Sequence, residues 1–241
     1  MEGRPQETRR LGSGYETEGR RNVMEIESNN EEENREKHQA EAARSRLEKQ
    51  MDFLLEMDKS KEIIRQTYLS DGSRKEDDAE HAWHMALMAM LLCEYANEPV
   101  DKTRVIEMAL VHDLVEVDAG DTYAYDKAGN ATKREREVKA AERIFNLLPE
   151  DQAAYLRGLW DEFEAGKTPE AKFTNTLDKV QPILLTNAAH GKSWLEHHVK
   201  EQDILDRNKA TGDGSRTLWD YFRHILDENV EAGLIILEKE G

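Results

Sequence analysis

Apolar residues recur at helical spacing in every strongly patterned segment of this 241-residue chain, and this periodicity limits what the chain can fold into. Side chains three and four positions apart share one face of a helix, whereas a half-buried strand needs strict alternation. The sequence shows neither such alternation nor an internal repeat, so it predicts an all-α fold. The predicted inward-facing positions are Leu47, Met51, Leu54 and Leu55, then Met85, Met88, Ala89 and Leu92, then Val105, Ile106, Ala109 and Leu110, then Val138, Ala141, Ile144 and Phe145, then Leu156, Leu159, Trp160 and Phe163, and finally Leu218, Phe222, Ile225 and Leu226.

Capping residues predict the boundaries of several helices. Thr168 followed by Pro169 is typical of an N-cap with proline at the first helical position. Ser215 predicts the N-cap of the last helix. Residues 132–135, Thr-Lys-Arg-Glu, form a capping-box pattern that predicts the start of a fourth helix, and Pro149 is expected to end it.

The first part of the chain differs from the rest in composition. Residues 1–45 contain too few apolar side chains to fold alone, and we expect them to be disordered or loosely helical. Residues 46–241 are long enough for one domain with a sizeable core. The sequence therefore predicts a single-domain helical bundle behind a disordered acidic and polar tail.

Two histidines and two aspartates are the strongest candidates for chemistry. His112 and Asp113 are adjacent, while His81 and Asp178 come from distant helical segments. Imidazole nitrogen and carboxylate oxygen suit Mn, Co, Fe and Zn, and to a lesser degree Mg. Neighbouring side chains on a helix diverge by about 100°, so His112 and Asp113 can bind one ion only from the end of a helix. We interpret the four residues as ligands of one divalent metal ion.

The order of these motifs resembles the HD-domain phosphohydrolases, and within them the bacterial 5'-deoxynucleotidases and the HD domain-containing protein 2 group. The resemblance covers roughly residues 46 to 238. It rests on residues 80–84 (EHAWH), 112–116 (HDLVE), 119–122 (AGDT), 177–182 (LDKVQP) and 191–194 (GKSW), together with the last helix. It implies an HD-domain helical bundle and metal-dependent phosphate hydrolysis. Two-metal relatives bring extra histidines between the His-Asp pair and the late Asp; none is present here, so one ion is expected.

Two further acids follow the His-Asp pair. Glu116 lies one helical turn beyond it, beside the same cleft, and Asp121 follows Gly120. The resemblance implies that both take part in catalysis, by placing the attacking water and transferring protons. The residues alone do not assign the acid and the base. The ordinary alternative for either residue is a helix cap or a surface carboxylate.

Substrate contacts are predicted at Arg65, Lys179 and Tyr123. A cation would bind phosphate, and the family has an arginine upstream of the first histidine, to which Arg65 corresponds within about one residue. Tyr123 flanks the turn at residues 120–122 and suits a pocket role. The ordinary alternatives are solvated cations and core aromatics; for Trp83 we expect the core.

Three functions are compatible with these residues. The first is a metal-dependent 5'-nucleotidase that hydrolyses (deoxy)nucleoside 5'-monophosphates to nucleoside and phosphate through a metal-activated water. The second is a pyrophosphohydrolase or phosphodiesterase acting on another nucleotide. The third is a metal- and nucleotide-binding sensor without turnover, which the intact Glu116 and Asp121 disfavour.

Composition limits the partners. A net charge of −17 argues against nucleic-acid polymers, while a small nucleotide remains compatible because local cations dominate within a site. The sequence predicts no membrane span, no secretory signal and no intramolecular disulfide, so we expect a soluble cytoplasmic protein. Relatives are often homodimers, and the long last helix is a candidate interface.

Overall fold

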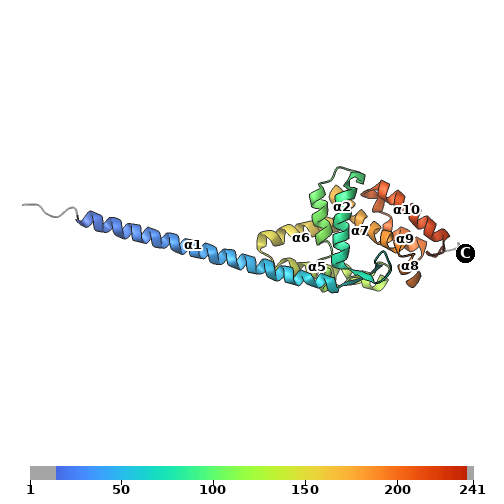
Figure 1. Ribbon diagram of the computed structural model, residues 1–241, viewed down its shortest axis with the longest axis horizontal. Coiled ribbons are helices and arrows are strands. Elements are labelled where there is room, and N and C mark those ends of the chain that lie inside the picture. The colour runs from blue at the N-terminus through green and yellow to red at the C-terminus, as the bar shows by residue number, and fades with distance from the viewer. Residues whose placement is uncertain (1–14, 238–241) are drawn as a thin grey trace, which may run out of the picture. The chain divides into compact units, whose positions relative to one another are not determined.

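The computed structural model describes residues 15–237 (Figure 1). The chain divides into two units, Met1–Glu48 and Lys49–Gly241. Helix α1 (Tyr15–Met57) runs through the first unit into the second, and the described side chains of residues 35–48 are exposed. The predicted boundary at residue 45 and the predicted disorder before it stay predictions.

The second unit is helical, which confirms the predicted class. After α1 the elements are η1 (Asp58–Glu62), β1 (Ile64–Tyr68), β2 (Lys75–Asp77), α2 (Asp78–Leu92), η2 (Cys93–Tyr95), α3 (Lys102–Val111), α4 (Glu116–Ala119), α5 (Lys127–Phe145), α6 (Glu150–Ala165), α7 (Pro169–Ala188), α8 (Lys192–Glu196), α9 (Glu201–Asn208), η3 (Thr211–Asp213) and α10 (Arg216–Glu231). None of the described helices is both long and apolar enough to cross a membrane.

A small antiparallel hairpin of β1 and β2 is the exception to the helical class. Ile64 pairs with Asp77 and Tyr68 with Lys75. The strands have alternating burial, but their inward side chains are the polar Arg65, Thr67 and Glu76. A search for alternating apolar residues therefore misses this sheet.

Side-chain caps define the helix starts. The Thr168 hydroxyl accepts the Ala171 N–H and Pro169 occupies the first turn of α7, while Ser215 accepts the Leu218 N–H at the start of α10. Both predicted caps are confirmed. The predicted capping box at residues 132–135 is wrong, because α5 has already begun at residue 127, where the Asp126 carboxylate accepts two backbone N–H groups.

Helix α7 forms the centre of the bundle and contacts α2, α3, α6 and α10. Its Phe173, Leu177 and Val180 are fully buried. Burial on several sides makes this helix rigid, so a functional side chain on α7 is held in a fixed place.

Several predictions about burial are wrong. Trp83 is 64% exposed on α2 rather than in the core. Leu110 on α3 is also exposed. On α1, Leu47, Met51, Leu54 and Leu55 are exposed, while Phe53 is buried. The α1 segment contains more apolar residues than its narrow contact face can cover, so periodicity alone selected the wrong ones.

Candidate metal centre

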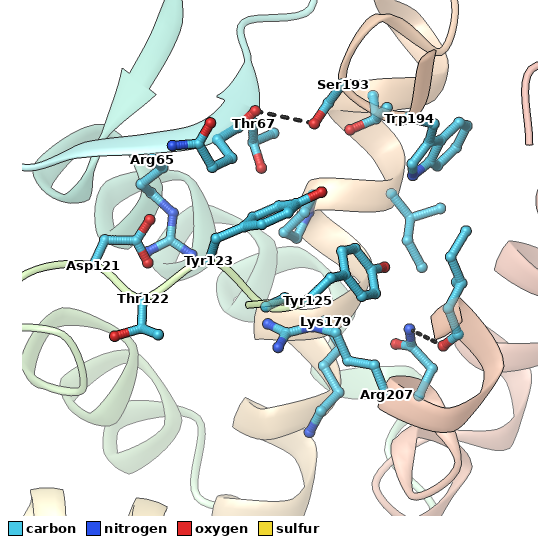
Figure 2. A pocket seen from close by; sticks show the side chains of 17 residues that line it. Arg65, Thr67, Asp121, Thr122, Tyr123, Tyr125, Lys179, Ser193, Trp194 and Arg207 are labelled. Atoms are coloured by element: carbon cyan, nitrogen blue, oxygen red, sulfur yellow. Dashed lines mark hydrogen bonds between the residues drawn. The ribbon is translucent and has the colours of Figure 1, made fainter. Parts of the chain in front are cut away.

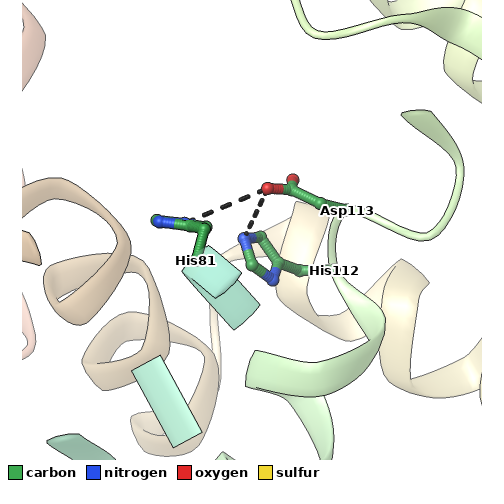
Figure 3. Close-up of side chains that lie close together, drawn as sticks. All are labelled: His81, His112 and Asp113. Carbon is green, nitrogen blue, oxygen red and sulfur yellow. Dashed lines mark ion pairs between the residues drawn. The ribbon is translucent and has the colours of Figure 1, made fainter. Parts of the chain in front are cut away.

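The structure brings the four predicted ligands together. Nε2 of His112 lies 3.0 Å from Asp113 Oδ2, and Nε2 of His81 lies 4.0 Å from the same oxygen (Figure 3). Oδ1 of Asp178 lies 3.3 Å from His81 Nε2 and 3.9 Å from His112 Nε2. Two ligand atoms that bind one ion at about 2.0–2.2 Å are roughly 3–4 Å apart. The spacing therefore suits a shared ion, and the ligand roles stay a prediction.

The end of α3 explains how adjacent residues point into one space. His112 is the C-cap of α3, and its N–H donates to Met108 O at 2.9 Å. Asp113 follows the end of the regular helix. Its side chain therefore does not have to point about 100° away from that of His112, as it would within a helix. This matches the expectation from the sequence that His112 and Asp113 can bind one ion only from the end of a helix. Across the cluster, His81 lies in the first turns of α2, and Asp178 lies on α7.

The orientation of both imidazoles tests whether the residues fit a metal ion. Nδ1 of His81 lies 3.0 Å from Gln181 Oε1, and Nδ1 of His112 lies 2.9 Å from Ala109 O. Each acceptor requires a proton on Nδ1, which leaves the Nε2 lone pair free. Both Nε2 atoms are buried without a hydrogen-bond partner among the residues described. Metal-binding histidines show this arrangement, so the donor set fits.

Carboxylates raise the attraction of the cluster for positive charge. Although burial opposes protonation of His81, its contacts with Asp178 and Glu76 raise its pKa to about 9. A metal ion that binds the His81 imidazole would therefore compete with a proton.

Arg65 is buried beside the candidate metal centre and already forms ion pairs with carboxylates of the protein. Its Nη1 lies 2.7 Å from Asp113 Oδ2 and 3.1 Å from Asp78 Oδ1, and its Nε lies 3.7 Å from Glu76 Oε1. The inward-facing positions of β1 and β2 supply Arg65 and Glu76. The guanidinium thus offsets carboxylate charge within the protein before any substrate arrives.

The two predicted catalytic acids lie in different surroundings. Glu116 is buried at the start of α4, where it groups with Asp113 and Asp78, and Lys133 Nζ lies 3.5 Å from its Oε1. Burial, followed by the charge of Asp113, raises the Glu116 pKa well above its usual value. Asp121 instead lines a pocket, and burial raises its pKa as well.

The three predicted substrate-contact residues line this same pocket. Figure 2 shows Arg65, Asp121, Tyr123 and Lys179 among the side chains that line it. The Tyr123 ring packs on His197 with centroids 4.4 Å apart, and its buried hydroxyl has no hydrogen-bond partner among the described residues. Burial lowers the pKa of Lys179. The structure therefore brings Arg65, Lys179 and Tyr123 together, while their contact with substrate stays a prediction.

Sequence reasoning missed several residues of the site. They are Glu76, Asp78, Lys133, Gln181 and Arg207. Only Gln181 carried a local signal, because it lies one turn after Asp178 on the same helix. The others reach the site through tertiary packing.

Comparison with known proteins shows the family to which the chain belongs. The sequence model of the HD domain matches residues 57–219, and the chain belongs to this family. The crystal structure of a predicted metal-dependent phosphohydrolase from Magnetospirillum magnetotacticum MS-1 is 48% identical, covers 79% of this chain and 96% of its own, and superposes with a TM-score of 0.76.

Curated relatives are 5'-deoxynucleotidases. The human 5'-deoxynucleotidase HDDC2 is 36% identical over 55% of this chain and 63% of its own length. The Dictyostelium discoideum HDDC2 protein is 30% identical over 66% of this chain and 88% of its own. The chain spans less than two thirds of the human relative's length.

Replacing Gln181 by methionine is expected to lower metal affinity roughly 10-fold to 100-fold, the usual effect of losing a partner that orients a metal-binding histidine. The variant removes the acceptor for His81 Nδ1 with little change in volume. Titration of the purified protein with Mn²⁺ by calorimetry measures the change. Gln202→Met, on the exposed face of α9, is the control; equal affinity in the Gln181 variant and the wild type would contradict the role of Gln181.

Proposed function

We propose that this protein is a metal-dependent phosphohydrolase that acts as a 5'-nucleotidase on (deoxy)nucleoside 5'-monophosphates. The observation that carries the proposal is a pair of buried imidazole nitrogens that face Asp113 and Asp178 and have no hydrogen-bond partner in the described part of the chain. Similarity to proteins named 5'-deoxynucleotidase, and to a predicted metal-dependent phosphohydrolase, supports the same reaction class.

One divalent ion would be held by His81, His112, Asp113 and Asp178, and Mn, Co, Mg, Fe and Zn are all compatible with that donor set. When bound, such an ion supplies an acidified water and polarises a phosphoryl oxygen. Glu116 lies among the buried acids beside Asp113 and would orient the attacking water. Asp121 faces the pocket and would protonate the departing ester oxygen.

The pocket supplies the proposed substrate contacts. Arg65 would donate hydrogen bonds to phosphate while its net charge stays offset by Asp113 and Asp78. Lys179 would contribute positive charge. The Tyr123 hydroxyl, which no described residue hydrogen-bonds, would bond to a polar group of the nucleotide.

An assay that resolves the products by chromatography, including nucleoside, nucleoside phosphates, inorganic phosphate and pyrophosphate, separates the three candidate functions. Metal-free protein is reconstituted with Mn²⁺, Co²⁺ or Mg²⁺ and tested on nucleoside mono-, di- and triphosphates and on a cyclic phosphodiester. The 5'-nucleotidase proposal predicts phosphate from monophosphates. Turnover confined to the other substrates favours the pyrophosphohydrolase or phosphodiesterase, and nucleotide binding without turnover favours the sensor.

We also propose that the protein forms a homodimer. Trp83, Leu87, Met90 and Leu91 are exposed at helical spacing on α2, and such an apolar stripe is typical of an interface. Trp83→Glu is expected to shift the molar mass from dimer to monomer in light scattering, because it places a charge in the buried contact. A monomeric wild-type protein would contradict this.

The predicted cytoplasmic location stays a prediction.

A further inference from the structure

The substrate pocket is lined by three cationic side chains, and two of them have no ion-pair partner among the described residues. Arg65 is bound to carboxylates, as described above. Lys179 on α7 and Arg207 on α9 line the same pocket, and neither lies within 4.0 Å of a described carboxylate oxygen. The pocket therefore contains two positive charges that no carboxylate of the described residues neutralises through an ion pair.

Arg207 lines the pocket from α9. Its charge interacts with Asp178 and with Lys179, and also with Tyr123 and Tyr125. Figure 2 shows its side chain among those that line the pocket. An exposed arginine is ordinarily solvated, but here the guanidinium is directed to a pocket that contains a second unneutralised cation.

A phosphate monoester needs this charge. It carries close to two negative charges near neutral pH, and it would enter a site that already contains Asp113, Asp121 and Asp178. Arg65 and Lys133 are committed to carboxylates of the protein. Beside the metal ion that the proposed function requires, cations that remain free would offset the repulsion between the substrate and these acids.

We infer that Arg207, together with Lys179, binds the phosphate group of the substrate. This inference rests on the proposed function and adds a contact residue to it. A guanidinium forms paired hydrogen bonds with phosphate oxygens, and an ammonium contributes a compact charge. The nucleoside part of the substrate would then extend from the metal centre past the two tyrosines.

The test compares Arg207→Gln with the wild type, both loaded with Mn²⁺. The expected result is a roughly 10-fold to 100-fold weaker affinity for inorganic phosphate, the effect of losing one charge-assisted hydrogen bond. KM for a deoxynucleoside monophosphate should rise by a similar factor. Inhibition by the uncharged deoxynucleoside should stay unchanged. Arg207→Lys, which keeps the charge, should recover part of the phosphate affinity.

The matched control is Lys209→Gln, which removes the same charge just after α9 but outside the pocket. Phosphate affinity equal to wild type in Arg207→Gln overturns the inference, as does a selective loss of deoxynucleoside inhibition. Calorimetric phosphate binding needs no turnover. A wild-type protein that binds phosphate through Arg207 but hydrolyses no monophosphate therefore refutes the proposed function while supporting this contact.

Discussion

The variant Asp178→Asn is expected to lose its metal ion and its phosphohydrolase activity together. Asp178 Oδ1 faces both imidazole Nε2 atoms, and the amide that replaces it is neutral and a weaker ligand for a hard cation. Losing a partner that only orients a ligand costs 10-fold to 100-fold in affinity. Loss of a ligand itself should therefore cost at least about 100-fold. Metal content after dialysis and turnover at saturating substrate are the two measurements.

Asp178 is the preferred position for this test because Asp113 also forms an ion pair with the buried Arg65. An Asp113 variant leaves that guanidinium uncompensated, so instability would obscure the loss of metal. Asp220→Asn, on the exposed face of α10, controls for the change of charge. A folded Asp178→Asn protein that retains a full equivalent of metal would contradict the ligand assignment.

Replacing Glu116 by glutamine is expected to spare the metal and remove turnover. The side chain lies beside Asp113 but outside the set of four proposed ligands. Glutamine keeps the shape but can neither accept nor donate a proton, and general acid–base groups contribute roughly 100-fold to 10,000-fold to rates. We therefore expect kcat to fall within that range, while the Mn²⁺ affinity changes by less than about threefold.

Glu137→Gln is a closely matched control for Glu116→Gln. Glu137 is also buried in the folded protein, and its Oε1 lies 3.2 Å from the same Lys133 Nζ. It should retain turnover within a few-fold, because it does not belong to the acid group around Asp113. An equal loss of activity in both variants would show that the position of Lys133, rather than Glu116, controls the rate.

The helical class and several boundaries could be predicted because they depend on local chemistry. Thr168, Pro169 and Ser215 act on backbone groups within a few residues of themselves, so the sequence reveals their roles. The β1–β2 hairpin could not be predicted from apolar alternation, because its buried face is built from Arg65, Thr67 and Glu76. Those side chains are stabilised by partners that are distant in sequence.

Within the site, too, residues whose type alone is informative could be predicted, whereas residues that depend on distant partners could not. The order of His81, His112, Asp113 and Asp178 identified a candidate metal centre because their residue types suit one class of ligand. Gln181, Lys133 and Arg207 gain their importance only from what they approach after folding. Core burial is the ordinary expectation for an aromatic residue such as Trp83, but apolar residues cover more of α2 than its neighbours can bury.

X-ray absorption spectroscopy of the Mn²⁺-loaded protein tests the central assignment most directly, because it reports the atoms around the ion without requiring activity. We predict a first shell of nitrogen and oxygen at about 2.0–2.2 Å with the outer-shell pattern of two imidazole rings. In the His81→Ala protein that pattern should fall to one ring. An ion bound without any imidazole, or an unchanged spectrum in that variant, would contradict the proposed metal centre.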